Sequence, residues 1–78
     1  MIDLISRAVL GTKYQRRRDD LLDEGWTILF EHTDQFGVFT KLRHRNGSII
    51  IITCDYGTGE LKQKTNGELV HSEKMCQS

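Results

Sequence analysis

Two apolar runs joined at Asn46-Gly47 constrain the fold of this chain more than any other stretch. Asn-Gly between such runs is a strong β-hairpin signal, because both residues tolerate the positive φ that a tight turn requires. The second run contains four consecutive isoleucines, Ile49 to Ile52, whose side chains must alternate between the two faces of a strand. A strand that is apolar on both faces belongs in the middle of a sheet. The pattern predicts a hairpin over residues 37–55 with a central second strand.

The first strand of this hairpin differs between its two faces. One face carries Val38, Thr40 and Leu42, and the other carries Phe39, Lys41, Arg43 and Arg45. Because side chains alternate along a strand, we expect the first set to face the core and the second to face outward.

The N-terminal third has the spacing of amphipathic helix. Residues 2–10 have this spacing, and Gly11 then interrupts it. Thr12 with Gln15 matches a capping box, which predicts a second helical segment over residues 13–24. Gly25 would be the C′ residue that ends this segment. Against two helices stands the charge order, because Arg16 to Arg18 would lie at the positive end of the second helix and four acidic residues at its negative end. Residues 2–24 are therefore predicted to form one helix or two.

The remaining strands follow from alternation and turn residues. Residues 26–32 are predicted as a strand with Trp26, Ile28 and Phe30 toward the core, and residues 33–37 as a short hairpin loop. The expected register pairs His32 with Val38, Phe30 with Thr40, Ile28 with Leu42 and Trp26 with His44.

The C-terminal part is more polar. Residues 60–65 are predicted as an exposed edge strand, Asn66-Gly67 as another turn, residues 68–71 as a short fifth strand, and residues 72–78 as a frayed tail. The chain is thus expected to be a single α+β domain over residues 1–78. An N-terminal helix or helix pair would pack on one face of a four- or five-stranded antiparallel meander sheet.

Charge and cysteine content limit the class of protein. Eleven basic and eleven acidic residues cancel, so partner choice must rest on local patches rather than on a global field. Cys54 and Cys76 are too few for a disulfide framework, which favours a reducing cytoplasm. The N-terminus lacks a signal-peptide cleavage pattern, and no segment approaches the roughly 20 apolar residues of a membrane span. We expect a cytoplasmic protein without membrane contact.

Catalytic and metal chemistry find no support in the residue pattern. The candidate metal ligands form no spaced pair, so neither a metal nor a cofactor is predicted; they are His32, His44, Cys54, His71 and Cys76. Cys54 has no predicted cation on its face to activate it, and the carboxylates of residues 19–24 lie beside arginines where a solvated helix end is expected. We therefore expect no enzymatic activity and infer no small-molecule substrate.

The outward face of the sheet is the predicted contact surface. Two isoleucines must project there, and burying them would benefit a domain that buries only about 60% of its unfolded surface. We expect a small interaction or regulatory module that binds a protein partner or itself, as a homodimer, through Leu29, Glu31, Phe39, Lys41, Arg43, Ile49 and Ile51. The alternative is that the C-terminal segment, through Leu61, Leu69 and Val70, folds back over this patch.

A second hypothesis is nucleic-acid binding. Cations that alternate with an aromatic residue on a sheet can hold a phosphate backbone while Phe39 stacks on a base. The candidate residues are Arg16, Arg17 and Arg18 on the helix and Lys41, Arg43 and Arg45 on the strand. The competing interpretation is a solvated charged face. Salt distinguishes the two hypotheses, because phosphate-driven binding weakens steeply as salt rises.

Overall fold

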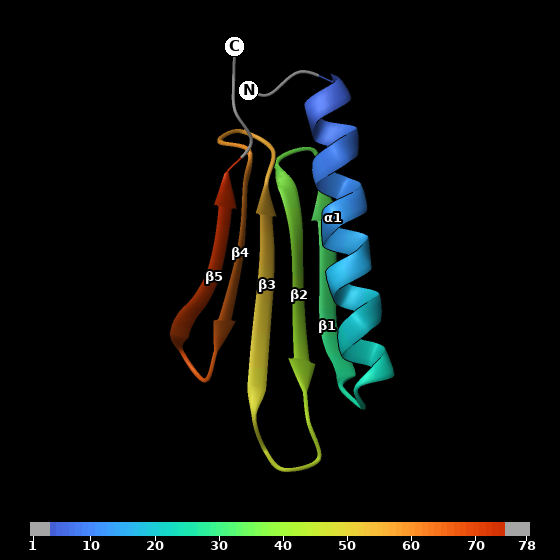
Figure 1. Cartoon of the computed structure of the whole chain (residues 1–78), viewed down its shortest axis with the longest axis vertical. Helices are drawn as coiled ribbons and strands as arrows, with labels where there is room; N and C mark the ends of the chain where they lie inside the picture. Colours follow the sequence, from blue (N-terminus) through green and yellow to red (C-terminus); the bar gives the residue numbers. More distant parts are fainter. Residues whose placement is uncertain (1–3, 75–78) are drawn as a thin grey trace.

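A helix followed by a five-stranded antiparallel sheet makes up the computed structural model, which describes residues 4–74 (Figure 1). The elements are α1 (Leu4–Asp23), β1 (Thr27–Asp34), β2 (Gly37–Arg43), β3 (Ile49–Asp55), β4 (Glu60–Thr65) and β5 (Glu68–Lys74). Each strand pairs with the next in the order β1-β2-β3-β4-β5, so the sheet is a meander. The predicted α+β arrangement is confirmed. Residues 72–74 belong to β5 rather than to a tail, and residues 75–78 of the predicted tail lie outside the described residues.

α1 is one continuous helix that runs through Gly11. Thr12 does not cap a second helix, because its hydroxyl donates to the carbonyl of Ala8 at 3.0 Å, which is a bond within the helix. The arginines therefore lie in the middle of α1, where the helix dipole does not oppose them. Of the two predicted alternatives, the structure has the single helix.

The C-terminal end of α1 is a Schellman motif. Gly25 has φ of +96°, its N–H donates to Leu22 O at 3.1 Å, and the N–H of Trp26 donates to Leu21 O at 3.0 Å. Gly25 is thus the C′ residue that the sequence predicts. The reversal brings Trp26 beside His44, with ring centroids 5.1 Å apart.

The two Asn-Gly turns differ in geometry. At the β2–β3 connection only Gly47 has positive φ, and the His44 N–H donates to Ser48 O at 2.9 Å, so the loop is wider than a two-residue turn. At the β4–β5 connection both Asn66 and Gly67 have positive φ, which gives the tight turn expected of this dipeptide.

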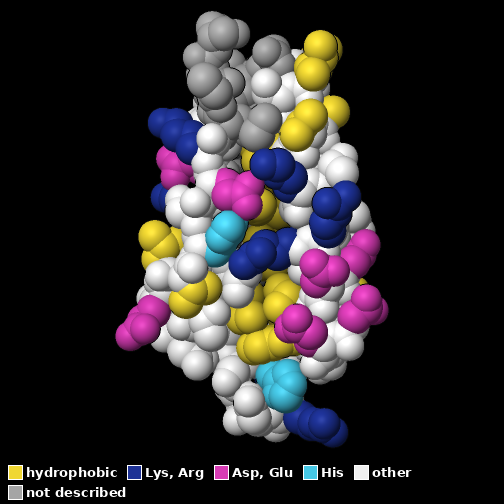
Figure 2. Space-filling model, in the orientation of Figure 1, with side chains coloured by type: hydrophobic (Ala, Val, Ile, Leu, Met, Phe, Trp, Pro, Cys, Tyr) yellow, Lys and Arg dark blue, Asp and Glu magenta, His cyan; other side chains and the backbone are white. Residues whose placement is uncertain are grey.

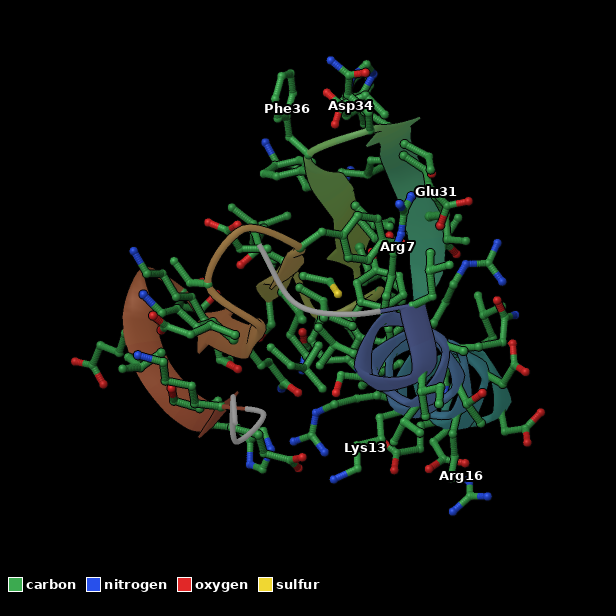
Figure 3. The ribbon with its side chains drawn as sticks, turned by 90° about the horizontal axis from the view of Figure 1, so that it is seen from above. Arg7, Lys13, Arg16, Glu31, Asp34 and Phe36 are labelled. Carbon is green, nitrogen blue, oxygen red and sulfur yellow. The ribbon has the colours of Figure 1, made fainter. Side chains whose placement is uncertain are left out.

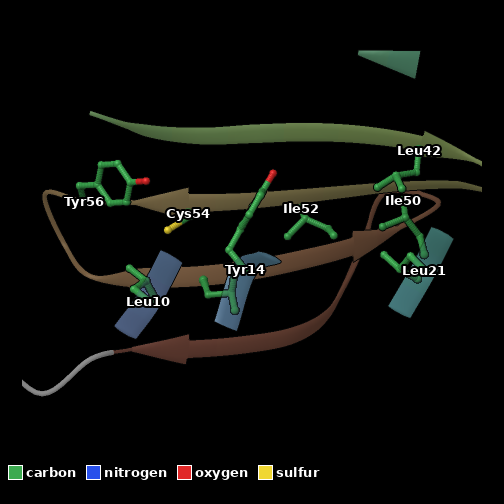
Figure 4. Packing of buried hydrophobic residues seen from close by; sticks show 9 residues of the cluster. Leu10, Tyr14, Leu21, Leu42, Ile50, Ile52, Cys54 and Tyr56 are labelled. Atoms are coloured by element: carbon green, nitrogen blue, oxygen red, sulfur yellow. The ribbon is translucent and has the colours of Figure 1, made fainter. Parts of the chain in front are cut away.

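One face of the sheet packs against α1 and forms the core. Seen from above, the strands form an arc with α1 on its concave side (Figure 3). The buried cluster draws residues from the helix, from three neighbouring strands and from the β3–β4 turn, and Ile50 and Ile52 are the two isoleucines directed into it (Figure 4). Its members are Leu10, Tyr14, Leu21, Leu42, Ile50, Ile52, Cys54, Tyr56 and Leu61.

A β-bulge in β1 changes the predicted register. Ile28 pairs with Leu42 as expected, but the pairing shifts at Leu29, so that Phe30 pairs with Lys41 and Glu31 with Thr40. One extra residue sends every following side chain to the opposite face. The predicted pairs of Phe30 with Thr40 and His32 with Val38 are therefore wrong, as is the core position of Phe30, which is 55% exposed.

The β1–β2 hairpin is also tighter than predicted. Asp34 pairs with Gly37, which leaves only Gln35 and Phe36 in the turn. The Asp34 carboxylate accepts the N–H groups of Phe36 at 2.8 Å and Gly37 at 3.1 Å, so this side chain holds the turn closed. The predicted loop over residues 33–37 is therefore too long.

Candidate interaction surface

The sheet face turned away from α1 carries an ordered array of side chains, and we call it the outer face. Directly paired residues lie on the same face, so the strand register defines rows that cross the sheet. The central row is Phe30, Lys41, Ile51, Lys64 and Leu69, one from each strand. On one side of it lie Thr27, Arg43 and Ile49, and on the other lie His32, Phe39, Thr53, Lys62 and Ser72.

Apolar side chains occupy the middle and one edge of the outer face. Ile49 and Ile51 lie half-buried on the central strand β3. Phe30 and Phe39 pack edge to face with ring centroids 5.9 Å apart. Leu29, the extra residue of the bulge, lines a shallow hollow with residues 27 and 43. Except for Phe30, which is predicted to face the core, these are the apolar residues that the sequence predicts for the outer face.

The C-terminal segment does not cover this surface within the described residues. Leu61 points to the opposite face, where it is part of the core. Leu69 lies on the outer face itself and is 55% exposed, because β5 extends the sheet instead of folding over it. The predicted alternative, a C-terminal cover made by Leu61, Leu69 and Val70, is therefore wrong for these residues.

Basic side chains flank the isoleucines on both sides. Lys41 and Arg43 stand on β2, and Lys62 and Lys64 stand on β4. Glu60 on the same face of β4 pairs with Lys62 at 3.2 Å. Cations thus predominate beside the isoleucines, whereas Asp34, Asp55 and Glu60 lie together at one end of the same face. The sequence pointed to the cations of β2; alternation along residues 60–65 would have identified those of β4 as well.

Glu31 is not part of the outer face, which corrects the sequence prediction. The bulge turns it toward α1, where its carboxylate accepts bonds from Arg18 Nε at 2.7 Å and from the Thr40 hydroxyl at 2.9 Å. Thr40 in turn accepts the hydroxyl of Tyr14. The hydrogen bond from Arg18 holds the pKa of Glu31 below its ordinary value, and burial raises the pKa of Tyr14 to about 12. These groups join α1 to β1 and β2.

The three helical arginines do not form one basic surface. Arg17 donates to Gln63 Oε1 on β4 at 2.6 Å, whereas Arg18 pairs with Glu31 on β1. Arg16 is exposed and points away from the sheet (Figure 3). Along α1, the basic side chains are followed by acidic ones toward its C-terminal end (Figure 2). The helical half of the predicted nucleic-acid site is therefore dispersed, and it lies on the side of the sheet opposite Lys41 and Arg43.

The remaining side chains that could support catalysis or bind a metal either have structural roles or do not cluster with one another. Burial raises the pKa of the Cys54 thiol to about 11, which leaves little thiolate at neutral pH. In residues 4–74, no three His, Cys, Asp or Glu side chains gather as a metal site would require. A hollow of about 480 Å³ at one end of the outer face contains Asp34 and Asp55, but each carboxylate accepts two backbone N–H groups of its own turn.

Comparison with protein-family models, with curated proteins and with solved structures returns no match. The helix that the structure describes is not apolar enough to cross a membrane. The outer face is therefore interpreted from its own geometry and charge.

Proposed function

We propose that this chain is a non-enzymatic interaction module of the cytoplasm that binds a protein partner through its outer face. The observation that carries the proposal is an apolar strip on the central strand, formed by Ile49 and Ile51, that α1 leaves uncovered and that cations flank on both sides. An apolar centre with a charged rim is the usual composition of a protein contact surface.

The charge of the outer face favours a different protein over a second copy of this chain. A symmetric dimer centred on the isoleucine strip would bring Lys41 and Lys64 close to the same lysines of the second copy, and such like-charge contacts are costly. A partner with acidic side chains around an apolar centre avoids this repulsion.

Both sheet edges carry features that disfavour strand addition. The register of β1 shifts at Leu29 and that of β5 at Val70, and bulges of this kind interrupt the ladder that an added strand would need. Binding through the face is therefore favoured over binding through an edge.

The proposal is tested by capture of partners from the native cytoplasm with and without nuclease. We expect the wild-type chain to retain a protein after nuclease treatment and Ile51→Glu to lose it, because a carboxylate would stand at the apolar centre. Arg16→Glu, which changes an exposed residue of α1, is the matched control and should retain the protein. Equal retention by all three chains, each with an unaltered circular dichroism spectrum, would contradict the proposal.

A second candidate function, nucleic-acid binding, rests on the two phenylalanines beside the cations. Phe30 is 55% exposed and contacts Phe39. Lys41 is the next residue of the central row, directly paired with Phe30. A base stacked on Phe30 would place its phosphate near these cations. Binding to mixed oligonucleotides that falls steeply with salt would support this candidate, and absence of binding at low salt would exclude it.

A further inference from the structure

The outer face has two parallel rows of cations whose separation suits one kind of partner. Lys41 on β2 and Lys64 on β4 both pair with Ile51, so their backbones are two strand spacings apart, about 10 Å. Arg43 extends the first row by about 7 Å to a position beside Ile49, whereas Lys62 extends the second by about 7 Å to a position beside Thr53, so the two rows face each other only across Ile51. We call these two pairs of cations the basic rails.

The floor between the basic rails is narrow and apolar. It consists of Ile49, Ile51 and Thr53, which are the outward side chains of a single strand and are half-buried. A strip one side chain wide matches the narrow apolar stripe that a helix presents when apolar residues recur every three or four positions. The stripe of such a helix can lie along β3.

The width between the basic rails matches the same shape. An α-helix with its side chains is about 10–12 Å across, so a helix centred over Ile51 has Lys41 on one side and Lys64 on the other, with Arg43 and Lys62 toward its opposite ends. The aliphatic stems of lysine and arginine can pack against the flanks of the helix while their charged groups reach carboxylates above. Acidic residues on both sides of the apolar stripe would complement Lys41, Arg43 and Lys64, whereas Lys62 already pairs with Glu60 at 3.2 Å.

We propose that the partner presents an amphipathic α-helix with acidic flanks, which lies along β3 between the basic rails. This inference rests on the proposed protein-binding function and specifies the chemistry of its partner. The floor itself disfavours a nucleic acid, because isoleucine and threonine provide no aromatic surface for a base. Phe39 borders the floor beside Thr53, and Phe30 lies farther out on β1.

Three synthetic peptides of about 18 residues, or about five helical turns, test the proposal with the full chain. The acidic peptide has a leucine stripe flanked on both sides by glutamate, the basic peptide has lysine at every glutamate position, and the broken peptide is the acidic one with a central proline. Binding is measured by fluorescence anisotropy, and the contact site by amide chemical shifts in NMR spectra.

We expect the acidic peptide to bind at least tenfold more tightly than the other two peptides. Its amide shift changes should concentrate at residues 41–43, 49–53 and 62–64. The double variant Lys41→Glu with Lys64→Glu places one carboxylate in each basic rail, and it should reverse the preference in favour of the basic peptide. Lys13→Glu with Arg16→Glu makes the same change of net charge on α1 and removes only the exposed Lys13–Glu73 ion pair, so it should keep the preference of the wild type.

Equal binding of the acidic and broken peptides would overturn the helical partner, and so would shift changes outside the outer face. Displacement of the acidic peptide by a single-stranded oligonucleotide that binds more tightly to the same residues would overturn it in favour of nucleic acid. If no peptide binds while Ile51→Glu still loses the captured cytoplasmic protein, the helical partner is wrong and the outer face remains the contact surface. If Ile51→Glu retains that protein, the proposed function itself fails.

Discussion

Gly37 and Gly11 show how the surroundings of a single residue decide what it contributes. A Cβ added at Gly37 would lie 2.1 Å from the carbonyl oxygen of Cys54, so only glycine allows β2 and β3 to approach there. A Cβ added at Gly11 would meet nothing within 4 Å, and Gly11 lies inside a helix, where glycine is unfavourable. The first glycine is required for packing, and the second is not.

Alanine substitutions at these two glycines should therefore change stability in opposite directions. Gly37→Ala forces the backbone of β2 away from Cys54 and should lower the free energy of unfolding by roughly 1–3 kcal/mol. Gly11→Ala should raise it by about 0.5–1 kcal/mol, because the unfolded chain loses freedom and the helix gains a better former. Urea denaturation measures both changes. A Gly37→Ala chain as stable as the wild type would show that the contact is relieved without cost.

Tyr14 should make stability depend on alkaline pH. Its pKa is raised by burial from 10.0 to about 12 in the folded chain, so between these values the unfolded chain ionises while the folded chain keeps its proton. The stabilisation is complete below the lower value and is lost as pH rises toward the upper one, by at most about 1.4 kcal/mol per pH unit. Tyr14→Phe has no such proton to lose, so its urea midpoint should fall less steeply over this range. Urea midpoints that fall equally steeply with pH in the two chains would contradict the raised pKa of Tyr14.

At the scale of elements, the sequence predicts those parts in which one short-range signal dominates. The Schellman end at Gly25 and the tight turn at Asn66-Gly67 follow from the φ values that these residues permit. The division of the isoleucine run between two faces follows from strand alternation. These features need no knowledge of distant contacts.

The β1 bulge could not be predicted in this way. In the run from Trp26 to Glu31, Leu29 breaks the alternation of apolar and polar residues, but one apolar residue on the exposed side of a strand does not by itself indicate a bulge. The bulge is accompanied by contacts distant in sequence, because it places Glu31 beside Arg18 and Thr40 and Phe30 beside Phe39. Compared with the prediction, the outer face therefore includes Phe30 and lacks Glu31.

Alternation along β3 gives a prediction that separates stability from binding. Ile52 is 0% exposed under α1, so Ile52→Ala should cost roughly 2–4 kcal/mol of unfolding free energy through the cavity it leaves. Ile51 is half-buried on the outer face, so Ile51→Ala should cost less than about 1.5 kcal/mol and should mainly weaken partner binding. Denaturation and partner capture on both chains check this. Equal losses of stability with unchanged binding would refute the assignment of faces.

At the scale of the whole molecule, the charges sum to zero but are unevenly distributed. The basic rails lie on one face of the sheet, whereas the acidic residues at the C-terminal end of α1, such as Asp23, lie on an element packed against the other face. Net charge alone therefore conceals a surface that attracts anionic partners at short range. With a Debye length of about 8 Å at physiological salt, this attraction acts mainly after contact begins.

Salt dependence should therefore distinguish the two candidate partners at this scale. A protein that covers the isoleucine strip gains from apolar burial, so its affinity should fall only modestly as salt rises. Arg43→Glu should weaken the binding of such a protein but leave most of the affinity that comes from the apolar contact. A nucleic acid should show a log–log slope of about −0.7 for each phosphate of a single strand that is neutralised, and Arg43→Glu should flatten that slope. Arg16→Glu makes the same charge change on α1 and should alter neither curve. A steep slope that Arg43→Glu leaves unchanged would place the anionic contact elsewhere on the molecule and remove the outer face from both hypotheses.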